Sequence, residues 1–445
     1  MISPKGKAIN CQDKQPKLFA AITRTREMIE ACDESPLLRA KKIDNAGKDK
    51  NTKAFTRKGG PFCAKNVVCI ILLRIYLSLQ LMLDEYFEAT ADIRKIELEG
   101  TKQGFSQARL KMNEKYIRSY ADMTGEVAAN GGDLCEFLGM EVYAIDGSTA
   151  ALENSQALIE GFGCSGSTKN AATASISLCF GPINGYIIDS QIERYGYSER
   201  SLAIAHIERL IELGKQGGLL IFGRGYPSKA FMAFIINSGF HFMMRVREKF
   251  DVRFDRVKTE KILPFEFEGK TYYIRVLKVR LESGEIETLV TTLCQKKLPI
   301  SKAGEIYFLR WKVEVAYDML KSKLQLENFS GKVRATVIQD FFATVYLANI
   351  VAFAAEEADK RVAANDEGKS LKYPRKANRN RVIRKVRNAF FDLLDEKNNA
   401  KREKMIDSLI ENCSKHPVSI TPQRASSVRK RPRAKRYHIG KKAVV

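Results

Sequence analysis

Residues 139–246 alternate strand-like and helix-like patterns in an order that few folds can accommodate. "GMEVYAIDGSTAAL" predicts a strand, "TASISLCFGPINGYIIDSQIERYG" a hairpin with "GPING" as its turn, and "SERSLAIAHIERLIELGKQ" a helix capped by Ser198. The buried strand of "GLLIFGRGYPS", the helix "KAFMAFIINSG" and the strand "FHFMMRVR" follow. The order strand, strand, strand, helix, strand, helix, strand indicates an α/β fold, a mixed sheet with helices on both faces.

A β-rich segment then interrupts this pattern at about residues 245–300. "TYYIRVLKVRL", the turn "ESGE" and "IETLVTTL" alternate with period two, which is typical of strands. The helical pattern that follows is expected to return to the same sheet. We therefore predict three parts, which are a helical N-terminal region (1–130), a central domain with the β-rich insertion (138–350) and a basic, helical or disordered C-terminal arm (351–445).

Charge favours a polyanionic partner. The chain holds 75 Lys and Arg against 52 Asp and Glu, a net charge of +23, and basic side chains gain free energy by releasing the counterions of phosphates. Residues 361–445 alone hold 24 basic and 8 acidic residues. A solubilising tail is one reading of this excess, and a phosphate-binding arm is the one we favour. In the helical pattern of 104–120, Arg109, Lys111 and Lys115 are either DNA contacts or a solvated face.

The remaining composition argues against a membrane or secreted protein. Nine cysteines without a CxxC pair predict neither a structural zinc site nor a disulfide framework. The apolar stretch 67–83 is interrupted by Arg74 and Gln80 and is shorter than the ~20 residues of a membrane span, so we expect a buried helix. We find no signal peptide and expect a cytoplasmic protein.

The stretch "YFLRWKVEVAYDMLKSKL" (307–324) has an unusual polar stripe. On one continuous helix, Tyr307, Arg310, Glu314 and Lys321 would point within about 60° of one another. A solvated face would spread its charges over a wider arc, so the stripe indicates a surface that faces a partner. Trp311 lies about 100° away from Arg310 on such a helix and is expected in the core.

Two acids stand out by their placement. Asp146 lies in a predicted strand before Gly147 and Ser148, and Glu314 lies at the centre of the stripe. One carboxylate on a strand and one on a later helix could converge on divalent metal, as in enzymes that cut phosphodiesters. Spacing alone does not decide this, because buried or surface-paired acids are much commoner than metal ligands.

The spacing Tyr307-x2-Arg310-x3-Glu314-x6-Lys321, followed by "LENFSGK", resembles the Tyr–Arg–Glu–Lys signature of bacterial insertion-sequence transposases of the DDE type, in the family numbered four. The segments "FSQARLKM", "YAIDGSTAAL" and "GRGYPS" and the basic C-terminal tail are similar to that family as well, and they occur in the same order.

The resemblance implies an RNase H-like catalytic domain with the β-rich insertion before its last catalytic helix. It implies Asp146 and Glu314 as the first and third acids of a Mg²⁺ or Mn²⁺ site. It further implies that the N-terminal region (1–130) binds DNA and that Tyr307, Arg310, Lys321 and Arg224 contact transposon-end DNA. The implied partners are the double-stranded terminal inverted repeats, target DNA and, in the DNA complex, a second copy of the chain. The implied location is the nucleoid of the bacterial cytoplasm.

One position departs from the family pattern. The family reads Asp-Arg-Gly-Tyr-Pro-Ser where this chain has Gly223 followed by "RGYPS", so the second metal-binding acid is missing. Asp189 and Glu193 are the nearby acids that could substitute for it. Three functions stay open, which are a transposase that cleaves and joins DNA, an inactive DNA-binding copy, and a nuclease without strand transfer.

Overall fold

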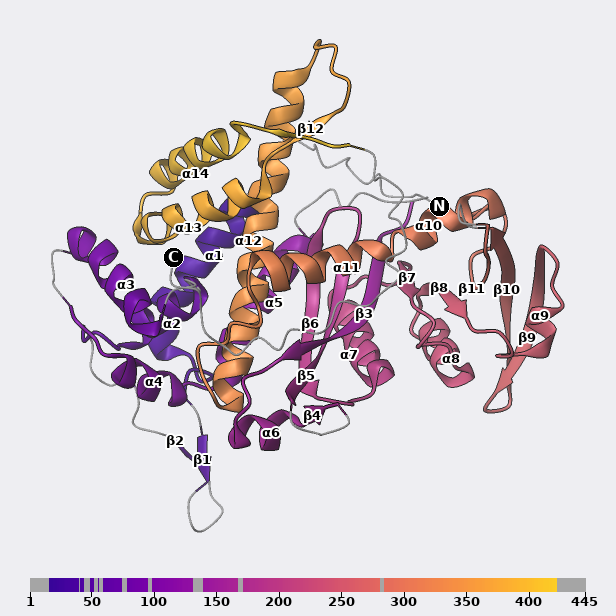
Figure 1. Ribbon diagram of the computed structural model, residues 1–445, viewed down its shortest axis with the longest axis horizontal. Coiled ribbons are helices and arrows are strands. Elements are labelled where there is room, and N and C mark those ends of the chain that lie inside the picture. The colour runs from indigo at the N-terminus through magenta and orange to yellow at the C-terminus, as the bar shows by residue number, and fades with distance from the viewer. Residues whose placement is uncertain are drawn as a thin grey trace, which may run out of the picture.

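The computed structural model describes residues 16–421 except for nine short stretches, at 40, 44–48, 52–54, 56–58, 74–77, 95–97, 131–138, 167–170 and 281–283. A helical N-terminal part precedes the sheet (Figure 1). Its elements are α1 (Lys17–Glu30), η1 (Cys32–Glu34), β1 (Lys41–Ile43), β2 (Asp49–Asn51), α2 (Ala64–Leu73), α3 (Leu79–Arg94), α4 (Lys102–Leu110) and α5 (Glu114–Asn130).

The predicted mixed α/β sheet is confirmed. Its elements are β3 (Val142–Ala151), α6 (Gln156–Phe162), β4 (Cys164–Ser165), β5 (Ala171–Gly181), β6 (Tyr186–Arg194), α7 (Glu199–Glu212), β7 (Leu219–Phe222), α8 (Lys229–Asn237) and β8 (His241–Val246). The parallel pairs are β3 with β7 and β7 with β8, whereas β3 pairs with β5 and β5 with β6 in antiparallel register.

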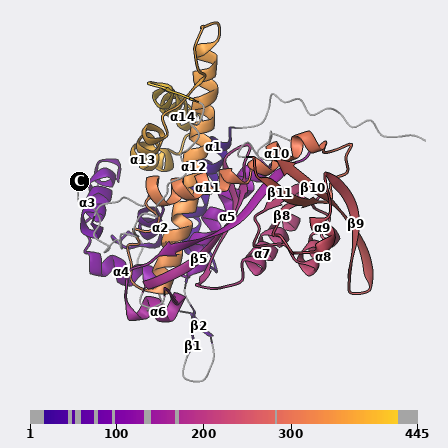
Figure 2. The same cartoon turned by 45° about the vertical axis from the view of Figure 1, so that its right-hand side comes forward.

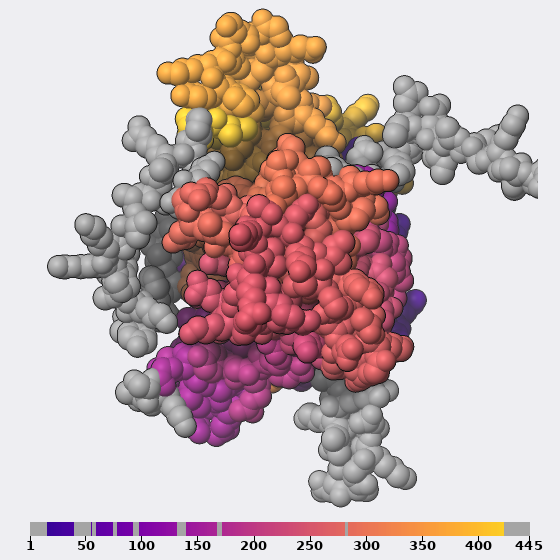
Figure 3. All heavy atoms as spheres, turned by 90° about the vertical axis from the view of Figure 1, so that its right-hand side faces the viewer, coloured from indigo at the N-terminus to yellow at the C-terminus, as the bar shows by residue number. Residues whose placement is uncertain are grey.

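The β-rich insertion extends this sheet rather than forming a unit of its own. It holds α9 (Val252–Asp255), β9 (Glu260–Phe267), β10 (Lys270–Arg280) and β11 (Ile286–Thr291). The strand β11 pairs antiparallel with β8, so the order runs β4-β5-β3-β7-β8-β11-β10-β9, with β6 on β5. Figure 3 views the molecule from the end formed by these insertion strands and their neighbouring helices.

Helices cover both faces of the sheet because successive strand side chains point to opposite sides. On one side, His206 of α7 hydrogen-bonds to Ser177 of β5, which pairs with Gly147. On the other side, Lys321, just beyond α11, hydrogen-bonds to Ser148. The sheet is thus enclosed between α7 and the segment that carries the predicted stripe.

The C-terminal part is folded onto the N-terminal helices. After the sheet come α10 (Ile300–Phe308), α11 (Trp311–Asp318), the π-turn η2 (Met319–Lys323), α12 (Arg334–Asp366), β12 (Arg375–Lys376), α13 (Arg379–Asp395), α14 (Asn399–Ser414) and β13 (Val418–Ser419). In Figures 1 and 2, α12 runs beside α13 and α14 on one side of the molecule, and β9–β11 lie on the other.

The boundary that we placed at residue 350 falls inside α12, and the segment after it does not form a separate arm. Phe390 of α13 is 1% exposed, and the guanidinium of the fully buried Arg402 donates to Thr23 Oγ1 of α1 at 3.1 Å. These contacts make α13 and α14 part of the helical core. The densest basic run, 424–445, lies outside the described residues.

Apolar length alone does not make α12 a membrane helix. It is long and apolar enough to cross a membrane, but 94% of its most apolar window is buried inside the protein. In the predicted buried stretch 67–83, the part that belongs to α2 is buried, while Arg74 lies outside the described residues. Both apolar segments that the structure describes therefore serve as core helices.

Arg109 does not face DNA, in contrast to one of the two readings that the sequence left open. It is 2% exposed, and its Nη2 lies 2.9 Å from Asp340 Oδ1 of α12. Its Nε donates to Gln339 Oε1 at 2.9 Å. The stretch 104–120 is divided between α4 and α5, with Lys111 and Lys115 exposed. Arg109 thus ties α4 to α12.

Candidate functional site

The segment 307–324 is not the single helix that the periodicity predicts. The helix α10 ends at Phe308, α11 begins at Trp311, and the π-turn η2 follows. The amides of Arg310 and Lys312 bond to carbonyls three residues back, which tightens the backbone between α10 and α11. This tightening shifts the helical phase. Tyr307 is therefore buried at 6% exposure, whereas Trp311 is 53% exposed, the reverse of the expectation for Trp311.

The break brings Arg310 between the two predicted acids. Its Nη1 donates to Asp146 Oδ2 at 2.9 Å and its Nη2 to Glu314 Oε1 at 3.0 Å. Because one guanidinium holds both carboxylates, these two oxygen atoms lie within about 9 Å of each other. The structure therefore brings Asp146 and Glu314 together, as the sequence predicted, but with a cation of the protein itself between them.

Position 223 lies at the same place. The strand β7 ends at Phe222, which pairs with Ile145 of β3, so Gly223 is a neighbour of Asp146. A Cβ atom built on Gly223 would lie 4.0 Å from Nη1 of Arg310, its nearest neighbour. The three positions that carry acids in the resembling family therefore converge on one guanidinium, and this chain has only two of the acids.

The electrostatics of Asp146 are set by burial and by Arg310. Burial raises the pKa of the Asp146 carboxyl to about 6, although the guanidinium of Arg310 and the Gly147 amide, 3.0 Å from Oδ1, both oppose the rise. The nearby carboxylates of Glu199 and Glu314 raise the pKa further. Asp146 thus needs a cation close by to stay ionised at neutral pH.

Lys321 and Tyr317 fix the helix to the strand that carries Asp146. The Lys321 ammonium donates to Ser148 Oγ at 2.9 Å and to the Thr149 carbonyl at 2.6 Å, and burial lowers its pKa. The Tyr317 hydroxyl donates to the backbone carbonyl of Asp146 at 2.8 Å. Sequence reasoning missed Tyr317, although its place three residues after Glu314 on a helix was a usable signal.

Asp189 cannot substitute for the missing acid. Its neighbour Ser190 pairs with Leu178, which pairs with Asp146, so Asp189 points to the opposite face of the sheet. Its carboxylate is buried 2.6 Å from His206 Nδ1. Burial would raise the pKa of Asp189, but His206 and Arg118 outweigh burial and lower it.

The other residues predicted for the site are divided between exposed and paired positions. The carboxylate of Glu193 lies 3.6 Å from Arg334 Nη2 and is thereby paired outside the site. Arg224, next to Gly223, is exposed and forms no ion pair with the described residues, so its guanidinium is accessible to a ligand.

The donor set fits one divalent cation better than a pair. Asp146 and Glu314 supply carboxylate oxygens, the ligands that Mg²⁺ prefers, but Gly223 supplies none. Among the described residues, no group of three or more His, Cys, Asp or Glu side chains is placed to hold a metal ion. A cation would also meet Arg310, which already bonds to both carboxylates.

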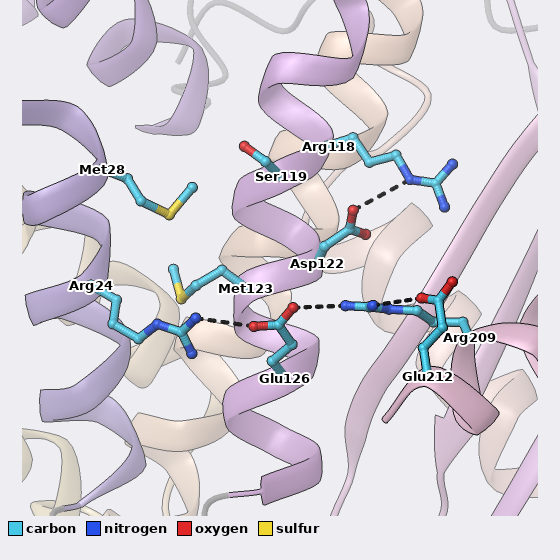
Figure 4. A pocket seen from close by; sticks show the side chains of 9 residues that line it. All are labelled: Arg24, Met28, Arg118, Ser119, Asp122, Met123, Glu126, Arg209 and Glu212. Atoms are coloured by element: carbon cyan, nitrogen blue, oxygen red, sulfur yellow. Dashed lines mark hydrogen bonds and ion pairs between the residues drawn. The ribbon is translucent and has the colours of Figure 1, made fainter. Parts of the chain in front are cut away.

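A hollow of about 420 Å³ lies elsewhere, lined by residues of α1, α5 and α7 (Figure 4). Its charged groups are already paired with one another, since Glu126 bridges Arg24 and Arg209 and Arg118 pairs with Asp122. None of the residues predicted for the site lines it. The hollow therefore gives no competing candidate for the functional site.

Comparison with known proteins points to one kind of domain. Residues 138–350 match the family model described as "Transposase DDE domain", which spans slightly less than half of the chain. The chain matches no curated protein. A solved structure, the cryo-EM structure of piggyBac transposase synaptic complex with hairpin DNA, shares 8% identity with it, at a TM-score of 0.38 over 89% of this chain and 83% of that one.

Proposed function

We propose that this chain is an insertion-sequence transposase of the DDE type, which binds transposon-end DNA. The family match over 138–350 supports this proposal. The observation that carries it is the convergence of Asp146, Gly223 and Glu314 on Arg310, because these are the three acid positions of the resembling family. The RNase H-like character of the domain is part of the proposal.

Asp146 and Glu314 would hold a Mg²⁺ or Mn²⁺ ion through their carboxylate oxygens. Such an ion, when bound, activates water or a 3′ hydroxyl for attack on a phosphodiester and stabilises the leaving oxygen. The residues around it have separate tasks. Tyr317 fixes the backbone of Asp146, and Lys321 holds the end of the helix against β3, so that the two carboxylates keep their relative position.

The same surface offers cations to a DNA backbone. Arg224 is exposed beside Gly223, and Arg310 has the planar fork that matches two phosphate oxygens. Lys321 supplies a point charge on the same side of the sheet. Tyr307 is too buried for the DNA contact that the resemblance implies, and its ring packs near the Arg310 guanidinium at 6.0 Å. We propose that two copies act together on the two transposon ends, in the cytoplasm of a bacterium.

A second candidate function is a DNA-binding copy that no longer cuts. Gly223 favours it, because two carboxylates leave a metal pair without its shared third ligand. Of the two substitutes that the sequence offered, Asp189 faces away and Glu193 is paired with Arg334, so neither repairs this. We therefore expect the unmodified chain to bind transposon ends and to cleave them poorly.

Labelled DNA with the inverted repeats that flank the gene separates these functions. The protein is incubated with end or random duplex in Mg²⁺ or Mn²⁺, and bound, nicked and joined products are resolved. Specific binding with little nicking supports the second candidate, nicking with joined products supports the active transposase, and nicking without joining indicates a nuclease. Equal affinity for end and random DNA would contradict a transposase function of either kind.

A further inference from the structure

The position between Asp146 and Glu314 is already taken by a cation. Both Nη atoms of Arg310 are used there, at 2.9 Å from Asp146 and 3.0 Å from Glu314. The Arg310 and Asp146 side chains are 13% and 22% exposed, so water screens that contact only in part, whereas Glu314 is 43% exposed and more open to water. A divalent ion that uses the same carboxylates must displace Arg310 or share their oxygens with it. The protein's own cation and the metal therefore compete.

Arg310 is also incompletely bonded where it lies. Its Nε is buried and has no hydrogen-bond partner among the described residues. A buried donor without a partner costs free energy, so this arrangement does not satisfy the side chain fully. A phosphate can accept from Nε and one Nη at once, as carboxylates and phosphates do in forked pairs.

We propose that Arg310 is a gate between DNA and metal. Without DNA, its guanidinium pairs with both Asp146 and Glu314 and lowers their affinity for a divalent cation. A backbone phosphate of bound DNA draws the guanidinium away and frees both carboxylates. DNA and metal then bind cooperatively, and the coupling is the same in both directions. This inference rests on the proposed function for its DNA partner, while the competition between Arg310 and metal stands without it.

The glycine at 223 strengthens the gate. A carboxylate at that position would lie next to Nη1, because the built Cβ is 4.0 Å from it. With glycine there, Arg310 faces two carboxylates that it can satisfy with one Nη each. A third carboxylate would add to the negative charge that two carboxylates already hold in excess of one guanidinium, and this larger excess would favour a divalent ion. The unmodified chain is therefore biased toward the arginine-held state.

Binding of Mn²⁺ alone to the DNA-free full-length protein tests the competition. Free Mn²⁺ is measured by electron paramagnetic resonance at about pH 8, above the pKa of about 6 of Asp146. Arg310→Gln should raise the Mn²⁺ affinity roughly tenfold or more, the size of a typical coupling between sites. Lys302→Gln is the matched control, because Lys302 is an exposed lysine whose ammonium pairs with Glu305 rather than with the two acids, and its Mn²⁺ affinity should stay within about twofold of the wild type.

The second arm measures the affinity for a terminal-repeat duplex with and without Mn²⁺. Saturating Mn²⁺ should raise the DNA affinity of the wild type by up to the factor found in the first arm, and Arg310→Gln should lose this gain. Mn²⁺ that binds the DNA itself acts on both proteins equally and cancels in the comparison.

Unchanged or weaker Mn²⁺ binding by a folded Arg310→Gln protein would overturn the gate. If that variant fails to fold, as judged by its thermal melt, Arg310→Lys is measured in its place. A lysine ammonium cannot hold both acids in a fork, so this variant should also bind Mn²⁺ more tightly than the wild type, by a smaller factor. Wild-type affinity in that lysine variant would overturn the gate as well. Equal affinity of the wild type for terminal-repeat and random DNA would instead reject the proposed function, and the Mn²⁺ result without DNA would remain valid.

Discussion

The buried contact between Arg109 and Asp340 should be one of the main sources of stability in the helical part. Both side chains are almost inaccessible, at 2% and 3% exposure. Arg109 also donates to Gln339 and to the Thr336 carbonyl, which joins α4 to the first turns of α12. Arg109→Met keeps the aliphatic stem and removes every one of these donors.

The expected cost follows from what remains behind. Removing one partner of a buried ion pair typically costs about 3–5 kcal/mol, because the other charge stays buried. Asp340 keeps two donors, the Ser330 amide at 2.6 Å and the Ser330 hydroxyl at 2.8 Å, so the lower end of that range applies. We expect a loss of about 3 kcal/mol, which is a large fraction of the ~5–15 kcal/mol that stabilises a typical domain.

Urea unfolding followed by circular dichroism measures this loss as a shift in the midpoint. Arg109→Met combined with Asp340→Asn removes the unpaired buried charge and should recover at least half of the stability that Arg109→Met alone loses. Lys111→Met is the matched control, since Lys111 is exposed nearby, and it should change stability by less than about 0.5 kcal/mol. A single Arg109 variant within about 1 kcal/mol of the wild type, or a double variant as unstable as the single one, would refute the reasoning.

Three further predictions concern DNA binding and pH. Lys321→Ala should weaken binding to transposon-end DNA more than to random DNA in a competition assay. Equal losses of affinity on both DNAs would show that Lys321 contributes only sequence-independent charge. Deletion of 422–445, which holds nine Lys and Arg and no acid, should lower both the DNA affinity and its salt slope; an unchanged slope would make this segment a solubiliser. Deletion from 372 would instead remove α13 and α14 from the core. Burial raises the pKa of Asp122 from 3.8 to about 6. Its ionised carboxylate therefore lowers the stability of the fold by its full amount above about pH 6, and this loss is absent below about pH 4. Asp122→Asn should therefore raise stability by about 1–2 kcal/mol near pH 7.5, with its partial exposure discounted, and this gain should vanish near pH 4; a pH-independent difference in melting would contradict this.

The sheet could be predicted from the sequence because each strand and helix carries its own local pattern. The alternation along β10 and β11 marked both strands, and Ser198 marked the start of α7. What local patterns do not contain is the partner of an edge strand. The pairing of β11 with β8, which makes the insertion part of the main sheet, depends on residues more than forty positions apart.

The acid pair was found because a spacing match identified its members, but the surroundings of Arg310 were not predicted. Helical periodicity assumes 3.6 residues per turn throughout. The tight bonds at Arg310 and the π-turn after Asp318 break that assumption in opposite directions. The predicted burial of Trp311 was therefore wrong, and Tyr307 is buried rather than part of an exposed stripe.

Buried polar contacts were equally invisible in the sequence. Arg109 looked like any basic residue on a helix, and only the fold shows Asp340 beside it, more than 200 residues away. Asp189 looked like a spare acid near the site until its strand register placed it on the other face with His206. In both cases tertiary packing, rather than local preference, decides the environment of the charge.

Cleavage of labelled transposon ends by the Gly223→Asp protein in Mn²⁺ tests the central claim most directly. Among the described residues, and apart from the chain neighbours of Gly223, only the Arg310 guanidinium lies within 4 Å of a Cβ built there, so the new side chain fits and places a third carboxylate beside Asp146. We predict at least a ~100-fold gain in cleavage over the unmodified protein, equivalent to about 2.7 kcal/mol of barrier. The isosteric Gly223→Asn protein should show no such gain, and all three proteins should bind the ends alike. Robust Mg²⁺-dependent cleavage by the unmodified protein, or equal cleavage by the Asp and Asn proteins, would contradict the account.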